Sequence, residues 1–142
     1  MLRYDPDQPP DPTQWLALDE QLRIDLVEAH HQQARIELPN AKAHAVFHVI
    51  VENQIAENLA PVVRAMARLA AQGLSRHEAV HAIAAVAAEH MHDLLNARLD
   101  KDASPAAYDA AVEQITADRW QQRYGPRRVL RAARQRKSPT RR

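Results

Sequence analysis

Histidines spaced four residues apart occur twice in this chain, in the pattern of metal ligands on a helix. The first run reads His44-x3-His48-x3-Glu52. At about 100° per residue, these side chains form one stripe along a helix face. The second run places His77 and His81 at the same spacing. Because imidazole and carboxylate groups suit Zn, Fe, Ni or Mn, the spacing predicts that these five residues hold a divalent metal, with zinc as the first choice.

Glu52 has two open roles in this predicted site. It is either a metal ligand or the acceptor that fixes the tautomer of a liganding imidazole. Lys42, Asn53 and Glu57 lie on the opposite side of the same helix, so we expect the His-His-Glu stripe to point inward. Buried polar groups need partners. The pattern therefore also fits a protein without a metal, in which Glu52 is the charge partner of core histidines that pack or respond to pH.

The segment His77-Glu78-Ala79-Val80-His81 matches the H-E-x-x-H motif of zinc proteases, in which the glutamate is the general base. A metal-dependent hydrolase with Glu78 as its catalytic residue is thus an alternative function. However, Ser75 stands three residues before Glu78, which is the spacing of a capping box. No strand is evident that would hold a peptide substrate. We therefore expect Glu78 to cap a helix.

A di-metal carboxylate bundle is a further alternative, because such bundles use Glu-x-x-His pairs. Glu28 with His31 and Glu89 with His92 both have this spacing. On the wheel of their helix, Glu28 and His31 point away from the apolar side, whereas His30 faces it. The di-metal site would therefore lose half of its ligands.

The elements that carry these residues are all expected to be helical. No alternating, β-branched run predicts a strand. Caps, prolines and glycines delimit about five helices. These are residues 14–38, residues 41–58 after Asn40, residues 61–72 between Pro61 and Gly73, a fourth from Ser75 to about residue 99, and a fifth from Ser104 to just before Gly125. The sequence therefore predicts an all-α bundle.

Short connections favour an up-down-up course through the second, third and fourth of these helices. The second and fourth would then be parallel, with His44 and His77 within about 3 Å of the same height at 1.5 Å per residue. The C-terminal end of the first helix would reach the same end of the bundle. Five histidines are therefore expected to gather there: His30, His44, His48, His77 and His81.

Composition limits the other function classes. The 142 residues include no cysteine, which excludes disulfides, thiolate metal sites and cysteine nucleophiles. No apolar stretch is long enough to span a membrane. Residues 1–12 are rich in proline and contain no secretory apolar region. We therefore expect an extended N-terminus and a cytoplasmic protein.

The net charge of +1 hides an uneven distribution. Residues 126–142 carry eight Lys or Arg and no acidic residue, which leaves 11 basic against 18 acidic residues in residues 1–125. We therefore predict a single helical domain, residues 1–125, followed by a disordered basic tail, residues 126–142. Such a tail could make weak contact with nucleic acid or an acidic protein, although it holds no aromatic residue that would stack on bases.

Three motifs within residues 39–95 are similar to those of a known family. They are His44-x3-His48, the segment Glu52-Asn53-Gln54 and the block from His77 to Ile83. In these motifs the chain resembles a bacterial family catalogued as domain of unknown function 1841. The resemblance implies a small helical protein of the bacterial cytoplasm, and it brings no activity, cofactor or partner.

The pattern of residues predicts a small cytoplasmic helical protein that binds a divalent metal through histidines on two adjacent helices. Two alternatives stay open at this point. One is a non-metal interaction module whose basic tail makes the contact, and the other is a metal-dependent hydrolase.

Overall fold

The computed structural model describes residues 2–33, 40–95 and 104–123, and these residues form helices without any strand. The predicted all-α fold is confirmed. The seven helices are α1 (Pro12–Ala17), α2 (Glu20–Gln33), α3 (Ala41–Ala56), α4 (Ala60–Ala71), α5 (Arg76–Leu95), α6 (Pro105–Gln114) and α7 (Ala117–Arg123). The basic tail lies outside the described residues, so its contacts stay a prediction. None of the described helices combines the length and apolar character needed to cross a membrane.

Local signals set most helix ends where the sequence places them. The Asn40 side chain accepts a hydrogen bond from the Ala43 N–H at 3.0 Å at the start of α3. At the start of α5, the Ser75 hydroxyl accepts from the Glu78 N–H, and Glu78 accepts from the Ser75 N–H at 3.0 Å. This reciprocal pair is the predicted capping box.

The helices α3 and α4 each end in a residue of left-handed conformation. Gly73, with φ of 100°, follows α4, and Asn58, with φ of 60°, follows α3. After Gly73, the Leu74 N–H donates to the Leu69 carbonyl at 3.1 Å, and the two leucines belong to the same buried core. This is the Schellman arrangement, which satisfies the last carbonyls of a helix. It ends α4 where the glycine predicts.

Two of the five predicted helices are each divided in two. The first is broken between α1 and α2, where the Arg23 guanidinium donates to the Leu18 carbonyl at 2.8 Å. The last is broken between α6 and α7, where the Arg68 side chain donates to the Ile115 carbonyl at 3.1 Å. Arginine side chains, Arg23 from the start of α2 itself and Arg68 from α4, thus satisfy carbonyls that a continuous helix would bond internally. Residues 34–38, 96–99 and 124 of the predicted helices lie outside the described residues.

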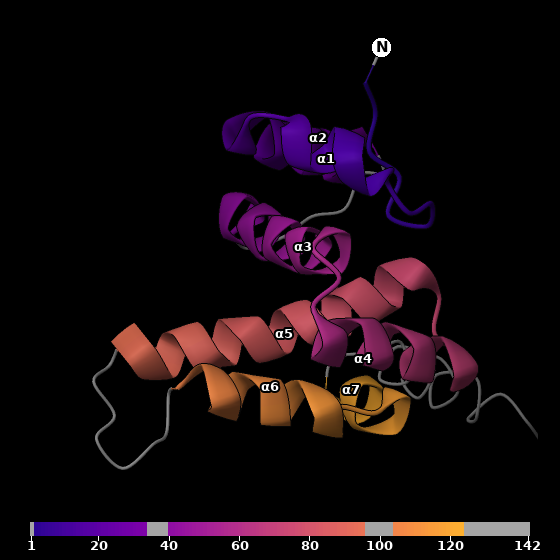
Figure 1. The fold of residues 1–142 in the computed structure, drawn as a ribbon, viewed down its shortest axis with the longest axis vertical. Helices are drawn as coiled ribbons and strands as arrows, with labels where there is room; N and C mark the ends of the chain where they lie inside the picture. Colours follow the sequence, from indigo (N-terminus) through magenta and orange to yellow (C-terminus); the bar gives the residue numbers. More distant parts are fainter. Residues whose placement is uncertain (1, 34–39, 96–103, 124–142) are drawn as a thin grey trace, which may run out of the picture.

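The helix α3 lies between two others, with α2 on one side and α5 on the other (Figure 1). The main core is formed by α4, α5, α6 and α7 together with part of α3. Val62, Leu69, Val80 and Ile83 are fully buried in it. A second, smaller core joins the N-terminal segment, α1, α2 and the other side of α3. Because α3 packs against both cores, polar residues of α3 that lie between the two cores, such as His48 and Glu52, are buried.

The helices α3 and α5 run in opposite directions, so the predicted parallel arrangement is wrong. Glu52, near the end of α3, pairs with Arg76 at the start of α5. Towards the start of α3, His44 lies against His81, further along α5, with 2.9 Å between their Nε2 atoms. The chain turns back after Gly73 rather than after Asn58, so α5 returns along both preceding helices (Figure 1). The histidines still meet, because steps of four residues along either helix stay on one face.

A buried set of charged and polar side chains connects the N-terminal segment, α3 and α5. The Arg76 guanidinium donates to both carboxylate oxygens of Glu52, at 2.7 and 2.8 Å. The Tyr4 hydroxyl donates to the same carboxylate at 2.5 Å. Arg76 also donates to the Pro6 carbonyl at 2.9 Å. We call Tyr4, Glu52 and Arg76 the buried anchor; Glu52 is 1% exposed, and such a charge is tolerated only with partners of this kind.

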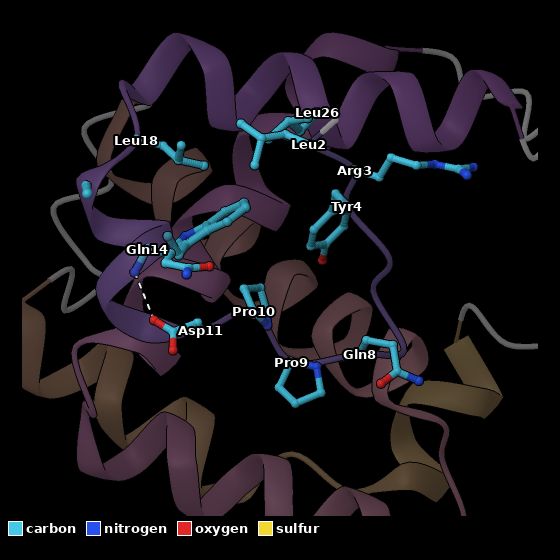
Figure 2. Close-up of a pocket in the computed structure, with 12 residues that line it drawn as sticks. Leu2, Arg3, Tyr4, Gln8, Pro9, Pro10, Asp11, Gln14, Leu18 and Leu26 are labelled. Carbon is cyan, nitrogen blue, oxygen red and sulfur yellow. Dashed lines mark hydrogen bonds between the residues drawn. The ribbon is translucent and has the colours of Figure 1, made fainter.

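The N-terminal segment is therefore a packed part of the fold, although no helix begins before Pro12. Tyr4 is 6% exposed and its ring points into the molecule (Figure 2). A cavity of about 620 Å³ lies between this segment, α1 and α2, with Tyr4, Trp15 and Leu18 in its wall. No histidine lines this cavity, so it is separate from the predicted metal site.

The buried anchor generates a stability prediction. Arg76→Met should lower the free energy of unfolding by about 3 kcal/mol, because it leaves the Glu52 carboxylate buried without its counter-charge. Urea unfolding at pH 7 measures the change. The matched control is Arg64→Met, which removes the ion pair of Arg64 and Glu113, whose side chains are 58% and 38% exposed. The control should melt like the parent, and equal losses in the two variants would contradict the importance of the anchor.

Candidate metal centre

Four imidazoles from three helices converge between the two cores. They are His31 near the end of α2, His44 and His48 in the first half of α3, and His81 in α5. One nitrogen from each ring lies within 4.8 Å of the nitrogens chosen from the others. His31 is 2% exposed and His48 is fully buried, whereas His44 and His81 are half-buried. We call these residues the four-histidine cluster.

His48 lies at the centre of this cluster. Its ring centroid is 4.9 Å from that of His31, 4.6 Å from that of His44 and 4.5 Å from that of His81. Both of its ring nitrogens are buried and have no hydrogen-bond partner among the described residues. A buried polar atom without a partner costs about 1–3 kcal/mol. A core histidine that only packs is normally hydrogen-bonded, so His48 requires another explanation.

The protonation of His31 follows from its surroundings. Its Nδ1 lies 2.9 Å from the Val27 carbonyl oxygen. A carbonyl only accepts hydrogen bonds, so Nδ1 carries the proton and Nε2 carries the lone pair. That Nε2 is also buried without a hydrogen-bond partner among the described residues. A histidine whose far nitrogen donates to a carbonyl while its near nitrogen is available has the arrangement of a metal ligand.

Burial keeps the imidazoles neutral. It lowers the pKa of His44 to about 4 and that of His81 to about 3, with neighbouring imidazoles adding to the effect. Burial lowers the pKa of His48 still further, again with help from the surrounding histidines. The pKa of His31 is lowered by burial as well. At neutral pH each ring therefore offers a lone pair, which is the form that binds metals.

The spacing of the nitrogens suits a transition metal. Zinc binds histidine nitrogen at about 2.0–2.1 Å in a tetrahedral arrangement, which separates the ligand nitrogens by about 3.3 Å. The Nε2 atoms of His44 and His81 are 2.9 Å apart. In the metal-free protein this contact is a hydrogen bond in which one ring donates to the other. An ion would replace this hydrogen bond: the donating ring would change tautomer, and small rotations of the two half-buried rings would open the separation to the required value.

The predicted site residues separate into three groups. His44, His48 and His81 come together as predicted. His77 lies beside them, with its ring centroid 4.3 Å from that of His81 and its Nε2 buried without a hydrogen-bond partner among the described residues, but it is outside the four-histidine cluster. The Glu52 carboxylate belongs to the buried anchor, where Tyr4 and Arg76 occupy its oxygens.

His31 was predicted to point away from the apolar side, and this prediction is wrong. That prediction depends on a helical wheel for one continuous helix from residue 14. The helix restarts at Glu20, with the Asp19 carboxylate accepting from the Gln21 N–H at 3.1 Å. The inner face of α2 therefore carries Val27 and His31, four residues apart. The capping potential of Asp19 is the signal that would have placed His31 inside.

The residues of the other predicted sites do not join the four-histidine cluster. Glu78 is engaged in the capping box with Ser75, as expected for a capping residue. Glu89 and His92, half of the predicted di-metal pairs, are exposed in the second half of α5. His30 is half-buried against Tyr4 and His77, with ring centroids at 6.1 and 5.7 Å. It lies at the edge of the cluster without joining it.

Comparison of this chain with protein-family models, curated proteins and solved structures found no match. The candidate site therefore depends on its own geometry and chemistry. The resemblance to domain of unknown function 1841 stays a prediction.

The lowered pKa values predict how the metal-free protein responds to acid. In the unfolded chain His44 and His81 have an ordinary pKa near 6.5, whereas in the folded protein these values are about 4 and about 3. The unfolded chain therefore binds more protons between these limits, and the free energy of unfolding falls as the pH falls below about 6.5. The loss at pH 5 should be on the order of 1 kcal/mol for each histidine, half the full linkage value because both rings keep some exposure.

Urea unfolding of the metal-free protein at pH 7.5, 6 and 5 measures this dependence. His81→Leu should make it shallower. The control His90→Leu, which changes a histidine that contacts Tyr108 away from the cluster, should leave it unchanged. A free energy of unfolding that is flat from pH 7.5 to pH 5 would contradict the prediction.

A substitution at the centre of the cluster should separate stability from metal binding. His48→Leu replaces two buried nitrogens that lack hydrogen-bond partners by apolar atoms of similar volume. In the metal-free protein it should raise the free energy of unfolding by about 1–2 kcal/mol, as measured by urea unfolding at pH 7.5. A histidine that packs with satisfied nitrogens would give a loss instead, and His90→Leu serves again as the control without a gain.

Proposed function

We propose that this protein binds one divalent transition-metal ion through His31, His44, His48 and His81. The observation that carries the proposal is the convergence of buried ring nitrogens without hydrogen-bond partners in the four-histidine cluster. An ion at their centre would provide a partner for Nε2 of His31 and for one of the two ring nitrogens of His48, which otherwise cost free energy. No other buried side-chain nitrogen or oxygen among the described residues, apart from that of His77, lacks a partner.

The donor set indicates which metals are suited. Neutral imidazoles are preferred by Zn, Cu, Fe and Ni, whereas Mg and Ca prefer oxygen ligands. Zinc remains the first choice, because it accepts four nitrogen ligands in a tetrahedral site without a redox requirement. The His31 ring is oriented by its bond to the Val27 carbonyl, which fixes the nitrogen that it offers.

The chain's own residues suggest what the ion does. His31, His44 and His81 come from α2, α3 and α5, so an ion would join three helices, two of which belong mainly to different cores. Binding to the folded state alone stabilises that state by mass action. We therefore propose a stabilising role for the ion. By its resemblance to domain of unknown function 1841, we also propose that the protein acts in the bacterial cytoplasm.

Metal analysis of protein purified without a histidine tag tests the proposal. We expect about one equivalent of zinc or another transition metal per chain after supplementation. His48→Ala and His81→Ala should abolish stoichiometric binding, whereas the matched control His90→Ala should retain it. Free metal at about 100 times its Kd should add about 2.7 kcal/mol to the free energy of unfolding. Absence of bound metal after supplementation, with an unchanged melting temperature, would favour the non-metal alternative.

A further inference from the structure

A second cavity opens directly beside the four-histidine cluster. Its volume is about 360 Å³, and its wall contains both His44 and His81. The remainder of the wall is apolar, with Phe47 from α3, Trp120 from α7 and alanines of α5 that include Ala88. A volume of this size accommodates a small organic molecule. The cavity therefore brings an apolar chamber against two of the proposed ligands.

The cavity lies on the side from which the cluster can be reached. His44 and His81 are half-buried, whereas His31 and His48 are buried behind them. A molecule in the cavity would thus meet the half of the cluster that faces outward. A four-coordinate metal can add a fifth ligand on an open side, and here the open side adjoins the cavity.

The charge of the site favours an anion there. A divalent ion held by four neutral imidazoles keeps its full charge of about +2, because the cluster holds no carboxylate among the described residues. Two carboxylates close to the histidines have other partners. Glu52 is paired with Arg76 in the buried anchor, and Asp7 accepts from the His77 N–H at 3.1 Å. An uncompensated charge in a partly buried site is costly, so a ligand that brings one negative charge is favoured over a neutral one.

We propose that this cavity binds a small monocarboxylate with an apolar body, whose carboxylate meets the metal between His44 and His81. The apolar body lies against Phe47, Trp120 and the alanines of α5. This inference depends on the proposed metal binding, since without the ion the carboxylate would have no cationic partner in the cavity.

Cobalt titration of the metal-free, full-length protein is the test, since the visible absorption of bound Co²⁺ reports its coordination. Benzoate should change the Co²⁺ spectrum with a Kd at least 10 times lower than that of acetate, which lacks the apolar body. Benzyl alcohol, which lacks the charge, should leave the spectrum unchanged at the same concentration. Equal affinities for benzoate and acetate would overturn the assignment of the apolar chamber, and an equal response to benzyl alcohol would overturn the need for an anion.

A cavity-filling variant locates the binding. Ala88→Phe should weaken benzoate binding at least 10-fold while leaving the Co²⁺ affinity within about twofold. The matched control is Ala67→Phe on the exposed side of α4, which should change neither quantity. Ala88→Leu is the smaller substitution, with the same expected direction if the phenylalanine variant does not fold. Unchanged benzoate affinity in the folded variant would overturn the location.

The two proposals fail in different ways. If Co²⁺ does not bind, the proposed metal function is wrong, and this inference is wrong with it. If Co²⁺ binds with a stoichiometry of about one and benzoate leaves its spectrum unchanged up to about 10 mM, the metal function stands and the inference is overturned.

Discussion

The buried pairing of Glu52 with Arg76 is the constraint on which the arrangement of the helices depends. It joins the end of α3 to the start of α5 and, through Tyr4 and the Pro6 carbonyl, holds the N-terminal segment against both. Burial, followed by the neighbouring Glu52 charge, raises the pKa of Tyr4 well above its usual value, so its hydroxyl remains a donor. Because neither charge can be left alone in the interior, the two helices have little freedom to slide past each other.

The same constraint determines where the histidines meet. His48 precedes Glu52 by one turn of α3, and His77 directly follows Arg76 in α5. Once Glu52 and Arg76 are paired, the imidazoles on the adjoining turns come into contact, with the rings of His48 and His77 at 5.3 Å and those of His48 and His81 at 4.5 Å. The interior thus contains two polar regions of different chemistry. One is charged and internally neutralised. The other is neutral, and nitrogens of His31, His48 and His77 there lack hydrogen-bond partners among the described residues.

The histidine region therefore stabilises the fold less than an ordinary apolar core would. Apolar residues of similar volume would remove the penalty of unsatisfied nitrogens, and the surrounding Val27, Ala45 and Val49 show that the chain otherwise packs this region with apolar side chains. Retaining four imidazoles here sacrifices stability unless something binds them. The metal ion proposed above would supply a partner for these nitrogens. The pKa values that burial and the neighbouring imidazoles lower keep the rings in the neutral form that binds metals.

The sequence by itself determined the helical class, the cap at Asn40, the capping box at Ser75 and the inward direction of His44, His48 and Glu52, because helical spacing and capping are local. It did not determine the direction of α5 relative to α3, the break before Glu20 or the burial of His31. Nor could it decide that Glu52 pairs with Arg76 rather than with an imidazole, since a carboxylate four residues from a histidine suits either partner. Those features depend on contacts between residues far apart in the chain, among them Arg23 with Asn53 and Tyr4 with Glu52. Only the packed structure brings such groups close together, and their burial and charge then determine which groups pair.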